Sequence, residues 1–138
     1  MVGETDLSIL LKNMKPIHNE GEYVFCCMPH ESTIDLQAIH LFFKEKEGIT
    51  VIFEKTYADT HGFSYPSVCA WLTLLIHSSL EAVGLTAAFS NALVEDNIPC
   101  NVLAGYYHYH LFVPLEKAEK AIDILKKLSM TQLIEEKP

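Results

Sequence analysis

An alternating run of side chains near the middle of the chain constrains the fold more than any other feature. From Ala70 to His77 two sets of residues alternate, Leu72, Leu74 and Ile76 against Trp71, Thr73, Leu75 and His77. Successive side chains of a β-strand point to opposite faces of a sheet, so the run predicts a strand with one strongly apolar face. The other elements of the fold must cover that face.

The segments that follow predict the rest of a small α+β unit. A helix is expected after the strand, then a hairpin, then a second helix that begins after Pro114. The hairpin arms are residues 100–104 and 109–113, and residues 131–135 are predicted to be a terminal edge strand. The order β-α-β-β-α-β is that of the split βαβ, or ferredoxin-like, plan. The predicted fold class is therefore α+β.

The first half of the chain offers the same plan in a reduced form. Thr5 or Asp6 can cap a short helix that is ended by Pro16. Residues 23–28 predict a strand, 30–37 a loop, 39–53 a hairpin with its turn at 45–48, and a short helix runs from Lys55 to Gly62. We therefore expect two ferredoxin-like halves side by side, a degenerate one over residues 1–66 and a more complete one over 67–138.

The charge balance excludes sequence-independent binding of nucleic acid. The chain has 138 residues, enough for one ordinary domain or two very small ones, with 18 acidic against 10 basic side chains. All ten basic residues are lysines, so the planar guanidinium that usually clamps carboxylates is missing. An anionic ligand must then be held by backbone amides, a helix N-terminus or a Lys.

Cysteine usage and apolar runs predict a soluble protein of the cytoplasm that has no membrane partner. The N-terminus is acidic and shows no basic segment leading into an apolar stretch, so no secretory signal is expected. The longest apolar run, residues 68–76, is less than half of the roughly 20 residues that a membrane helix needs. The four cysteines form no C-x-x-C pair, and the adjacent Cys26 and Cys27 should point to opposite faces of a strand. We expect free thiols.

Two strings of the second half resemble a known family. They are Ser78-Ser79-Leu80-Glu81-Ala82-Val83-Gly84-Leu85-Thr86-Ala87-Ala88-Phe89 and Asn101-Val102-Leu103-Ala104-Gly105-Tyr106-Tyr107-His108, and Glu22-Tyr23-Val24-Phe25-Cys26 of the first half also fits. The chain is similar to the small bacterial tandem ACT-domain proteins, an uncharacterised family, and the same kind of ACT pair recurs in a eukaryotic cytosolic arginine sensor. This resemblance implies a regulatory module that binds amino acids or other small effectors where two such domains meet.

The start of the helix after the alternating strand decides how a ligand could bind. A capping box of Ser78 and Glu81 would start the helix at Ser79 and leave Gly84 in its interior, at a cost of about 1 kcal/mol relative to Ala. The favoured alternative begins the helix near Gly84, after a loop in which Val83 takes the place of the family's proline. Free N–H groups there could bind a ligand carboxylate.

The candidate ligand-binding residues follow from this second alternative. The ammonium of an amino acid could meet Glu81, Asn101 or strand carbonyl groups. The full candidate set is Ser78, Ser79, Leu80, Glu81, Val83, Gly84, Leu85, Thr86, Asn101 and Val102. The competing interpretation makes the two serines local caps, Glu81 a capping or solvated acid, Gly84 a plain tight turn and Asn101 an edge residue bonded to its neighbours.

Histidines support a second hypothesis, and catalysis has little support. His77, His108 and His110 are predicted to share the open face of the sheet, where three imidazoles could hold zinc or copper, although surface or interface histidines are more common. The chain has neither G-x-S-x-G nor a phosphate-binding glycine loop, so we expect no enzyme.

The function predicted from the sequence is reversible binding of a small effector, and an amino acid is the expected one. The alternative is a structural or protein-interaction module with a vestigial effector site. Trp71 and Leu75 lie on the non-core side of their strand, which predicts that this face is covered by the other half or by a second subunit in a homodimer. Since no catalytic segment is recognised, any signal must pass to a separate protein partner.

Overall fold

The computed structural model describes residues 6–76 and 84–135, without the side chains of 131–135. Its strands pair in the order β3-β4-β2-β5-β7-β6, and β1 also pairs with β5. The strands are β1 (Lys15–His18), β2 (Tyr23–Met28), β3 (Ile39–Lys44), β4 (Ile49–Glu54), β5 (Cys69–Leu75), β6 (Asn101–Ala104) and β7 (Tyr109–Pro114). The helices are α1 (Leu7–Asn13), α2 (Lys55–Thr60), α3 (Leu85–Val94) and α4 (Ala118–Glu135), the last preceded by the 3-10 turn η1 (Leu115–Lys117).

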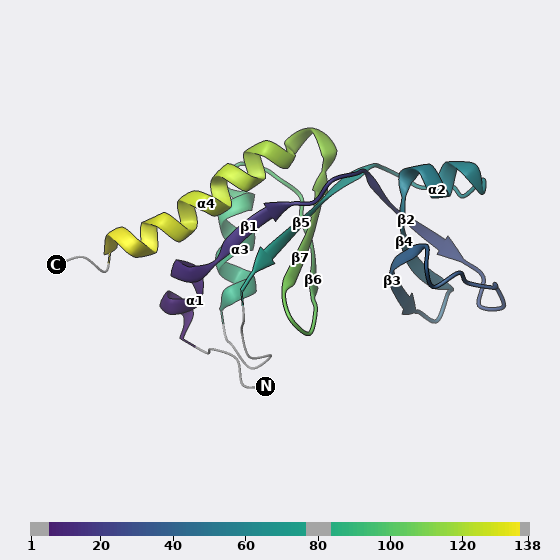
Figure 1. The fold of residues 1–138 in the computed structure, drawn as a ribbon, viewed down its shortest axis with the longest axis horizontal. Coiled ribbons are helices and arrows are strands. Elements are labelled where there is room, and N and C mark those ends of the chain that lie inside the picture. The colour runs from purple at the N-terminus through teal and green to yellow at the C-terminus, as the bar shows by residue number, and fades with distance from the viewer. Residues whose placement is uncertain (1–5, 77–83, 136–138) are drawn as a thin grey trace.

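The C-terminal half is a sheet covered by helices on one face. Its strands lie in the order β1-β5-β7-β6, and α1, α3 and α4 gather on the same side of them (Figure 1). The alternation of β5 sets that face, because Leu72 and Leu74 are completely buried against Leu85 and Phe89 of α3 and Leu125 of α4. The predicted apolar face of the alternating strand is therefore confirmed.

The fourth strand of this half comes from the opposite end of the chain. Residues 131–135 are helical, since α4 continues to Glu135, and the prediction of a terminal edge strand is wrong. The place beside β5 is filled by β1, whose Lys15 aligns with Leu75 and whose His18 aligns with Leu72. With that place occupied, a C-terminal strand would have no partner there. The ferredoxin-like fold is thus complete, with its last strand contributed by the N-terminus.

Local signals place the ends of the elements correctly. Asp6, one of the two predicted caps of α1, accepts a hydrogen bond from the backbone N–H of Ile9 at 3.1 Å. The helix ends at Asn13, before Pro16, as predicted. Pro16 itself lies in β1, an extended segment that we did not predict. The two hairpins, the short helix after Lys55 and the loop over 30–37 are confirmed. Thr5, the other predicted cap, lies outside the described residues.

The N-terminal half is thinner. It contains β2, β3 and β4, whose apolar side chains pack beneath α2, a helix of only 6 residues. Val24, Val51 and Ala58 are fully buried there. Residues 30–37 form a loop where a complete domain of this plan has its first helix. The sheet of this half therefore has fewer helices over it, as its predicted degeneracy implies. The division of the chain at residue 66 stays a prediction, since α1 and β1 pack on the C-terminal half.

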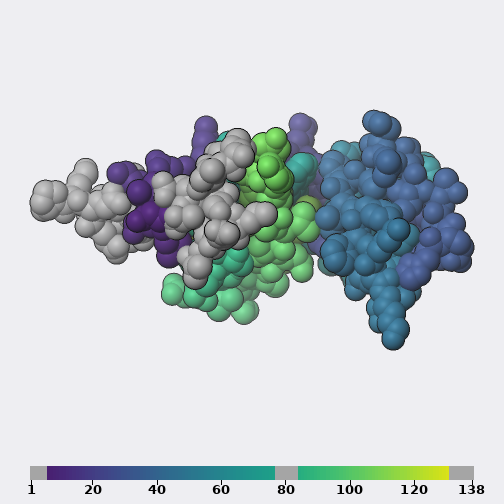
Figure 2. Space-filling model, turned by 90° about the horizontal axis from the view of Figure 1, so that it is seen from below, coloured from purple at the N-terminus to yellow at the C-terminus, as the bar shows by residue number. Residues whose placement is uncertain are grey.

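The two halves meet where β2 reaches the start of β5. Tyr23 of β2 aligns with Cys69 of β5, and from there the strands of the N-terminal half extend away (Figure 1). The space-filling view shows an elongated molecule with residues from about 20 to 65, in blue, at one end (Figure 2). The purple N-terminal helix lies toward the other end, in the C-terminal half. Within the described ranges, no helix has the length and apolarity needed to cross a membrane.

Candidate functional site

The predicted loop-to-helix site is described only from Gly84 onward. Gly84 is the N-cap of α3, with φ of +89° and no side-chain cap, so the helix begins where the favoured alternative placed it. A positive φ of this size is unfavourable for residues with a Cβ, which explains a glycine at this point. Leu85 is buried in the core and Thr86 is exposed. The other candidates at this end lie outside the described residues: Ser78, Ser79, Leu80, Glu81 and Val83.

The remaining candidates lie at the start of β6. Asn101 is exposed and aligns with Phe112, on the face of the sheet away from the helices. Val102 points the other way and packs against the core of the C-terminal half. Of these two residues, Asn101 is the one whose side chain is available to a ligand.

The structure places Gly84 and Asn101 toward opposite ends of the sheet. Asn101 aligns through Phe112 with Trp71 near the start of β5, whereas Gly84 follows the end of that strand at Leu75. From Trp71 to Leu75 the strand advances by four residues, which corresponds to about 13 Å along β5. The two ends are therefore separate within one chain, and a ligand site built from both stays a prediction.

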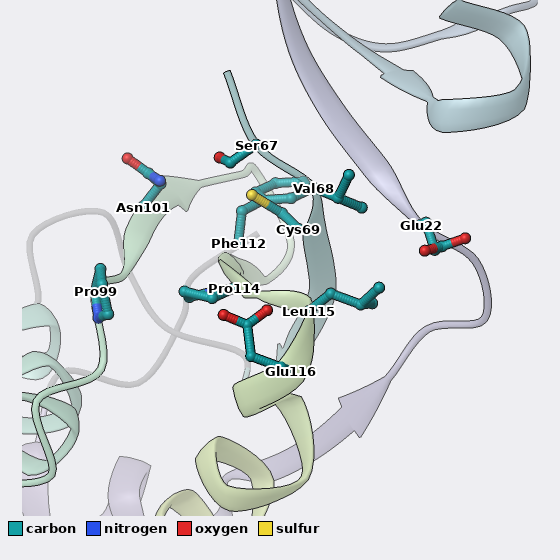
Figure 3. A pocket seen from close by; sticks show the side chains of 10 residues that line it. All are labelled: Glu22, Ser67, Val68, Cys69, Pro99, Asn101, Phe112, Pro114, Leu115 and Glu116. Carbon is teal, nitrogen blue, oxygen red and sulfur yellow. The ribbon is translucent and has the colours of Figure 1, made fainter. Parts of the chain in front are cut away.

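Asn101 lines a cavity of about 470 Å³ at the meeting point of the halves, which we call the joint cavity. Figure 3 shows its lining side chains, which are Glu22, Ser67, Val68, Cys69, Pro99, Asn101, Phe112, Pro114, Leu115 and Glu116. Glu22 lies just before β2, and the others belong to the C-terminal half or to the segment that leads into β5. In Figure 3 the Glu116 carboxylate points toward Pro114, and the Glu22 carboxylate lies on the far side of Leu115, apart from the other lining side chains. The cavity thus combines apolar walls with a few polar groups, as ligand sites do.

The charged groups of the joint cavity are acidic. Glu22 and Glu116 are exposed carboxylates from different halves, and the described lining contains no lysine. Burial raises the pKa of the Cys69 thiol; the Ser67 hydroxyl opposes the shift and Glu116 adds to it. Burial likewise raises the pKa of the nearby Tyr23, with Glu54 and Glu20 contributing in the same direction. The local potential therefore favours a positively charged group over an anion.

An aromatic cluster fills the contact between the halves. We call it the aromatic joint and define it as Tyr23, Phe25, His40, Trp71 and Phe112. The ring centroids of Tyr23 and Trp71 are 5.4 Å apart, those of His40 and Trp71 also 5.4 Å, and those of Phe25 and Phe112 5.4 Å. Trp71 contacts rings of the other half, which agrees with the first alternative of the prediction, and both Trp71 and Leu75 are half-buried on this face.

A polar network runs beneath the aromatic joint. The Trp71 indole Nε1–H donates to Nδ1 of His110 at 3.0 Å, and the Thr73 hydroxyl lies 3.1 Å from the same nitrogen. The Asn19 amide donates to the Thr73 hydroxyl at 2.8 Å and to the Trp71 carbonyl at 3.2 Å. Burial lowers the pKa of His110, and the neighbouring His108 lowers it further. A smaller cavity of about 170 Å³ lies here, lined in part by His40, Trp71 and His110.

Two of the three histidines of the predicted metal site, His108 and His110, lie in the described part of the chain. His110 shares the non-helical face with Trp71, as predicted, but its Nδ1 is engaged by Trp71 and Thr73. Nδ1 of His108 is buried without a hydrogen-bond partner. No group of three side chains suited to a metal ion occurs in residues 6–76 and 84–130. His77, the third member of the proposed cluster, lies outside the described residues.

The thiols follow the sequence-based expectation. All four cysteines are free, with Cys26 buried and Cys27 exposed on opposite faces of β2. Burial raises the pKa of the Cys100 thiol to about 11. A thiol with such a pKa is protonated at neutral pH and is a poor nucleophile. Nothing about this side chain points to a catalytic role.

The fold and the joint cavity define a class of protein. Two ferredoxin-like units share one sheet, and a ligand-sized cavity lies at their junction. An ACT-domain family model matches residues 2–70 and a second one matches residues 67–127. The chain therefore belongs to the ACT-domain family and carries two such domains in tandem. ACT domains are regulatory modules, and no catalytic domain is among the matched families.

Solved structures agree with this assignment. A protein of unknown function from Vibrio cholerae, for which a transport role has been suggested, is 40% identical with a TM-score of 0.81, over 89% of this chain and 95% of that one. A protein from Agrobacterium tumefaciens is 15% identical with a TM-score of 0.62, over 84% and 89% of the two chains. The aspartate kinase of Clostridium acetobutylicum, an allosteric enzyme, is 9% identical with a TM-score of 0.59, over 83% of this chain and 34% of the enzyme. The last two likenesses show the fold alone. A search of curated proteins gave no match.

Sequence reasoning named Asn101 as a candidate, and it did not name as candidates the other residues that line the joint cavity. Glu22 and Glu116 are far apart along the chain and meet at one cavity only because β2 and the end of β7 flank the start of β5. Glu22 opens the first-half string that resembles the family, and that position was the one available signal. The His110–Trp71 contact had a weaker signal, namely their shared face.

Proposed function

We propose that this protein is a regulatory module that reversibly binds a free amino acid in the joint cavity. The observation that carries the proposal is the composition of that cavity. It holds about 470 Å³, within the range of roughly 300–1,000 Å³ typical of small-molecule sites, and both halves contribute to its lining. Two carboxylates, one amide and one hydroxyl stand among apolar walls.

The polar groups fit the ends of an amino acid. The carboxylates of Glu22 and Glu116 would attract its ammonium group, and the amide of Asn101 can donate to its carboxylate. Apolar walls such as Phe112 and Leu115 remain for a side chain. Because this chain has no arginine, the carboxylate would be held by neutral donors.

Binding at this place would couple the halves. A ligand that contacts Glu22 from one half and Glu116 from the other favours the arrangement in which both reach it. We propose that this shift is transmitted to a separate protein partner, since ACT domains are regulatory and no catalytic domain is among the matched families. A homodimer would give a second copy of the site, and the free thiols favour the cytoplasm as the compartment.

The test is a thermal-shift screen of the purified protein against the twenty amino acids. A ligand at 100 times its Kd stabilises a protein by about 2.7 kcal/mol, which is several degrees for a chain of this size. Asn101→Ala should abolish the shift caused by the active amino acid. Asn91→Ala, a change of the same kind at an exposed position of α3, should leave it intact.

The same screen separates the two ends of the sheet. A shift that survives Asn101→Ala but is lost in Gly84→Asp would move the site to the N-terminus of α3. Gly84→Asn serves as the folding control there, since Asn tolerates a positive φ better than other side chains. A flat panel at millimolar ligand would contradict the proposal and favour an interaction module with a vestigial site.

A further inference from the structure

The hydrogen bonds of Trp71 fix the protonation state of His110. An indole N–H can only donate, so Nδ1 of His110, which lies 3.0 Å from it, must be an acceptor. The imidazole is then neutral, with its proton on Nε2. The Thr73 hydroxyl, only 7% exposed, approaches the same nitrogen and accepts from Asn19. A proton on Nδ1 could be shared with Thr73 but not with the indole.

Trp71 links His110 to the contact between the halves. Its backbone belongs to β5 of the C-terminal half, while its ring packs against Tyr23 of β2 and His40 of β3. His110 holds the indole from the other side, with the two ring centroids 5.7 Å apart. The side chain is therefore fixed from both halves, and the His110 hydrogen bond is its polar anchor.

We propose that His110 is a proton-sensitive latch: while neutral it anchors the Trp71 indole at the aromatic joint, and its protonation releases the indole from that hydrogen bond. The imidazolium would present a second N–H to the indole N–H, leaving the donor of Trp71 without its acceptor. The latch does not depend on the proposed amino-acid site. It adds a second input, the proton, at the junction of the two domains.

The direction of the pH dependence follows from burial. Burial and the nearby His108 lower the pKa of His110 below its ordinary value of 6.5. The unfolded chain therefore takes up the proton more readily than the folded one. The stabilisation by neutral His110 is present above pH 6.5 and is lost as the pH falls through the lower pKa of the folded state. The latch is closed near neutral pH and opens in mild acid.

The other groups that face His110 and Trp71 are few in the described part of the chain. His108 precedes β7, His40 lies over Trp71, and Tyr23 lies beside it. The residue opposite His110 on β6 is Leu103, and the one opposite Thr73 on β1 is Ile17. Lys15 lies further along β1, opposite Leu75. His108 and His40 are thus the competing titratable groups, and the experiment must separate them.

Trp71 is the only tryptophan of the chain, so its fluorescence reports on the latch directly. We expect one transition in emission as the pH falls below 6.5, because burial and His108 lower the pKa of folded His110 from that value. His110→Asn removes the titrating group and keeps a side-chain oxygen that can accept from the indole, so the transition should disappear. His40→Asn and His108→Asn should retain it.

A measurement on the unmodified protein makes the test independent of variant folding. In NMR spectra, the His110 ring protons and the Trp71 indole N–H should titrate together, while far-UV circular dichroism stays constant. The proposal is overturned if emission stays flat from neutral pH down to the onset of acid unfolding, or if the transition survives His110→Asn. It is equally overturned if His40→Asn or His108→Asn abolishes it, or if the change coincides with global unfolding.

Discussion

The two halves of this molecule share one sheet but differ in what covers it. In the C-terminal half, α1, α3 and α4 enclose the apolar face of β5 and β7 (Figure 1). In the N-terminal half, α2 supplies 6 residues, and the loop over 30–37 stands where the first helix of the plan would be. Strands of both halves bury apolar side chains, and the larger core belongs to the half whose sheet is covered by three helices.

Each half also uses a segment from the other part of the chain. The C-terminal half takes α1 and β1 from the N-terminus, and β2 of the N-terminal half pairs with the start of β5. The smaller half contacts the larger one through the aromatic joint. A sheet that continues into a better-covered neighbour can stabilise a degenerate domain.

The largest expected effect distinguishes the two cores. Phe89 is completely buried between α3 and the sheet, so Phe89→Ala should lower the free energy of unfolding by about 3–5 kcal/mol. Ile49→Ala in the N-terminal half should cost about 2 kcal/mol, at the low end for such a change, because the thin core can relax into the space. Urea denaturation followed by circular dichroism measures both. Equal losses would contradict the difference in the covering layer.

A smaller effect is expected at the junction. Asn19→Ala removes the side-chain amide from the Thr73 hydroxyl, while the Trp71 carbonyl keeps the backbone N–H of residue 19; the change should cost about 1 kcal/mol. Amide hydrogen exchange should then accelerate in both halves, around Tyr23 as well as around Cys69. The control is Asn91→Ala, at an exposed helical position. Acceleration in one half alone would show that the junction does not couple them.

The smallest expected effect tests whether α1 belongs structurally to the C-terminal half, on which it packs. Asp6→Ala removes the side-chain cap of α1 and should cost about 1 kcal/mol, whereas Asp6→Asn keeps an acceptor and should cost little. Hydrogen exchange should speed up in α1 and in the part of α4 that packs on it, where the Ser129 hydroxyl donates to the Lys12 carbonyl. Faster exchange in β3 or β4 instead would reverse this assignment.

Local patterns determined much of this protein. The alternation around Leu72 placed β5 and its buried face, Pro16 marked the end of α1, and Gly84 marked the start of α3. Each of these signals acts within a few residues, through side-chain period, ring geometry or a positive φ. The excess of acidic side chains also predicts no sequence-independent binding of nucleic acid. The string around Gly84 resembles the ACT family by sequence alone.

Only the tertiary structure decided how distant segments combine. β1 takes the strand position beside β5, so 131–135 stay helical; Gly84 and Asn101 fall toward opposite ends of the sheet; Glu22 and Glu116 meet at one cavity. The physical reason is that strand partners are chosen by hydrogen bonding and burial across the whole sheet. A sequence pattern gives the face of a strand, but its neighbour depends on which free edge the rest of the chain has left open.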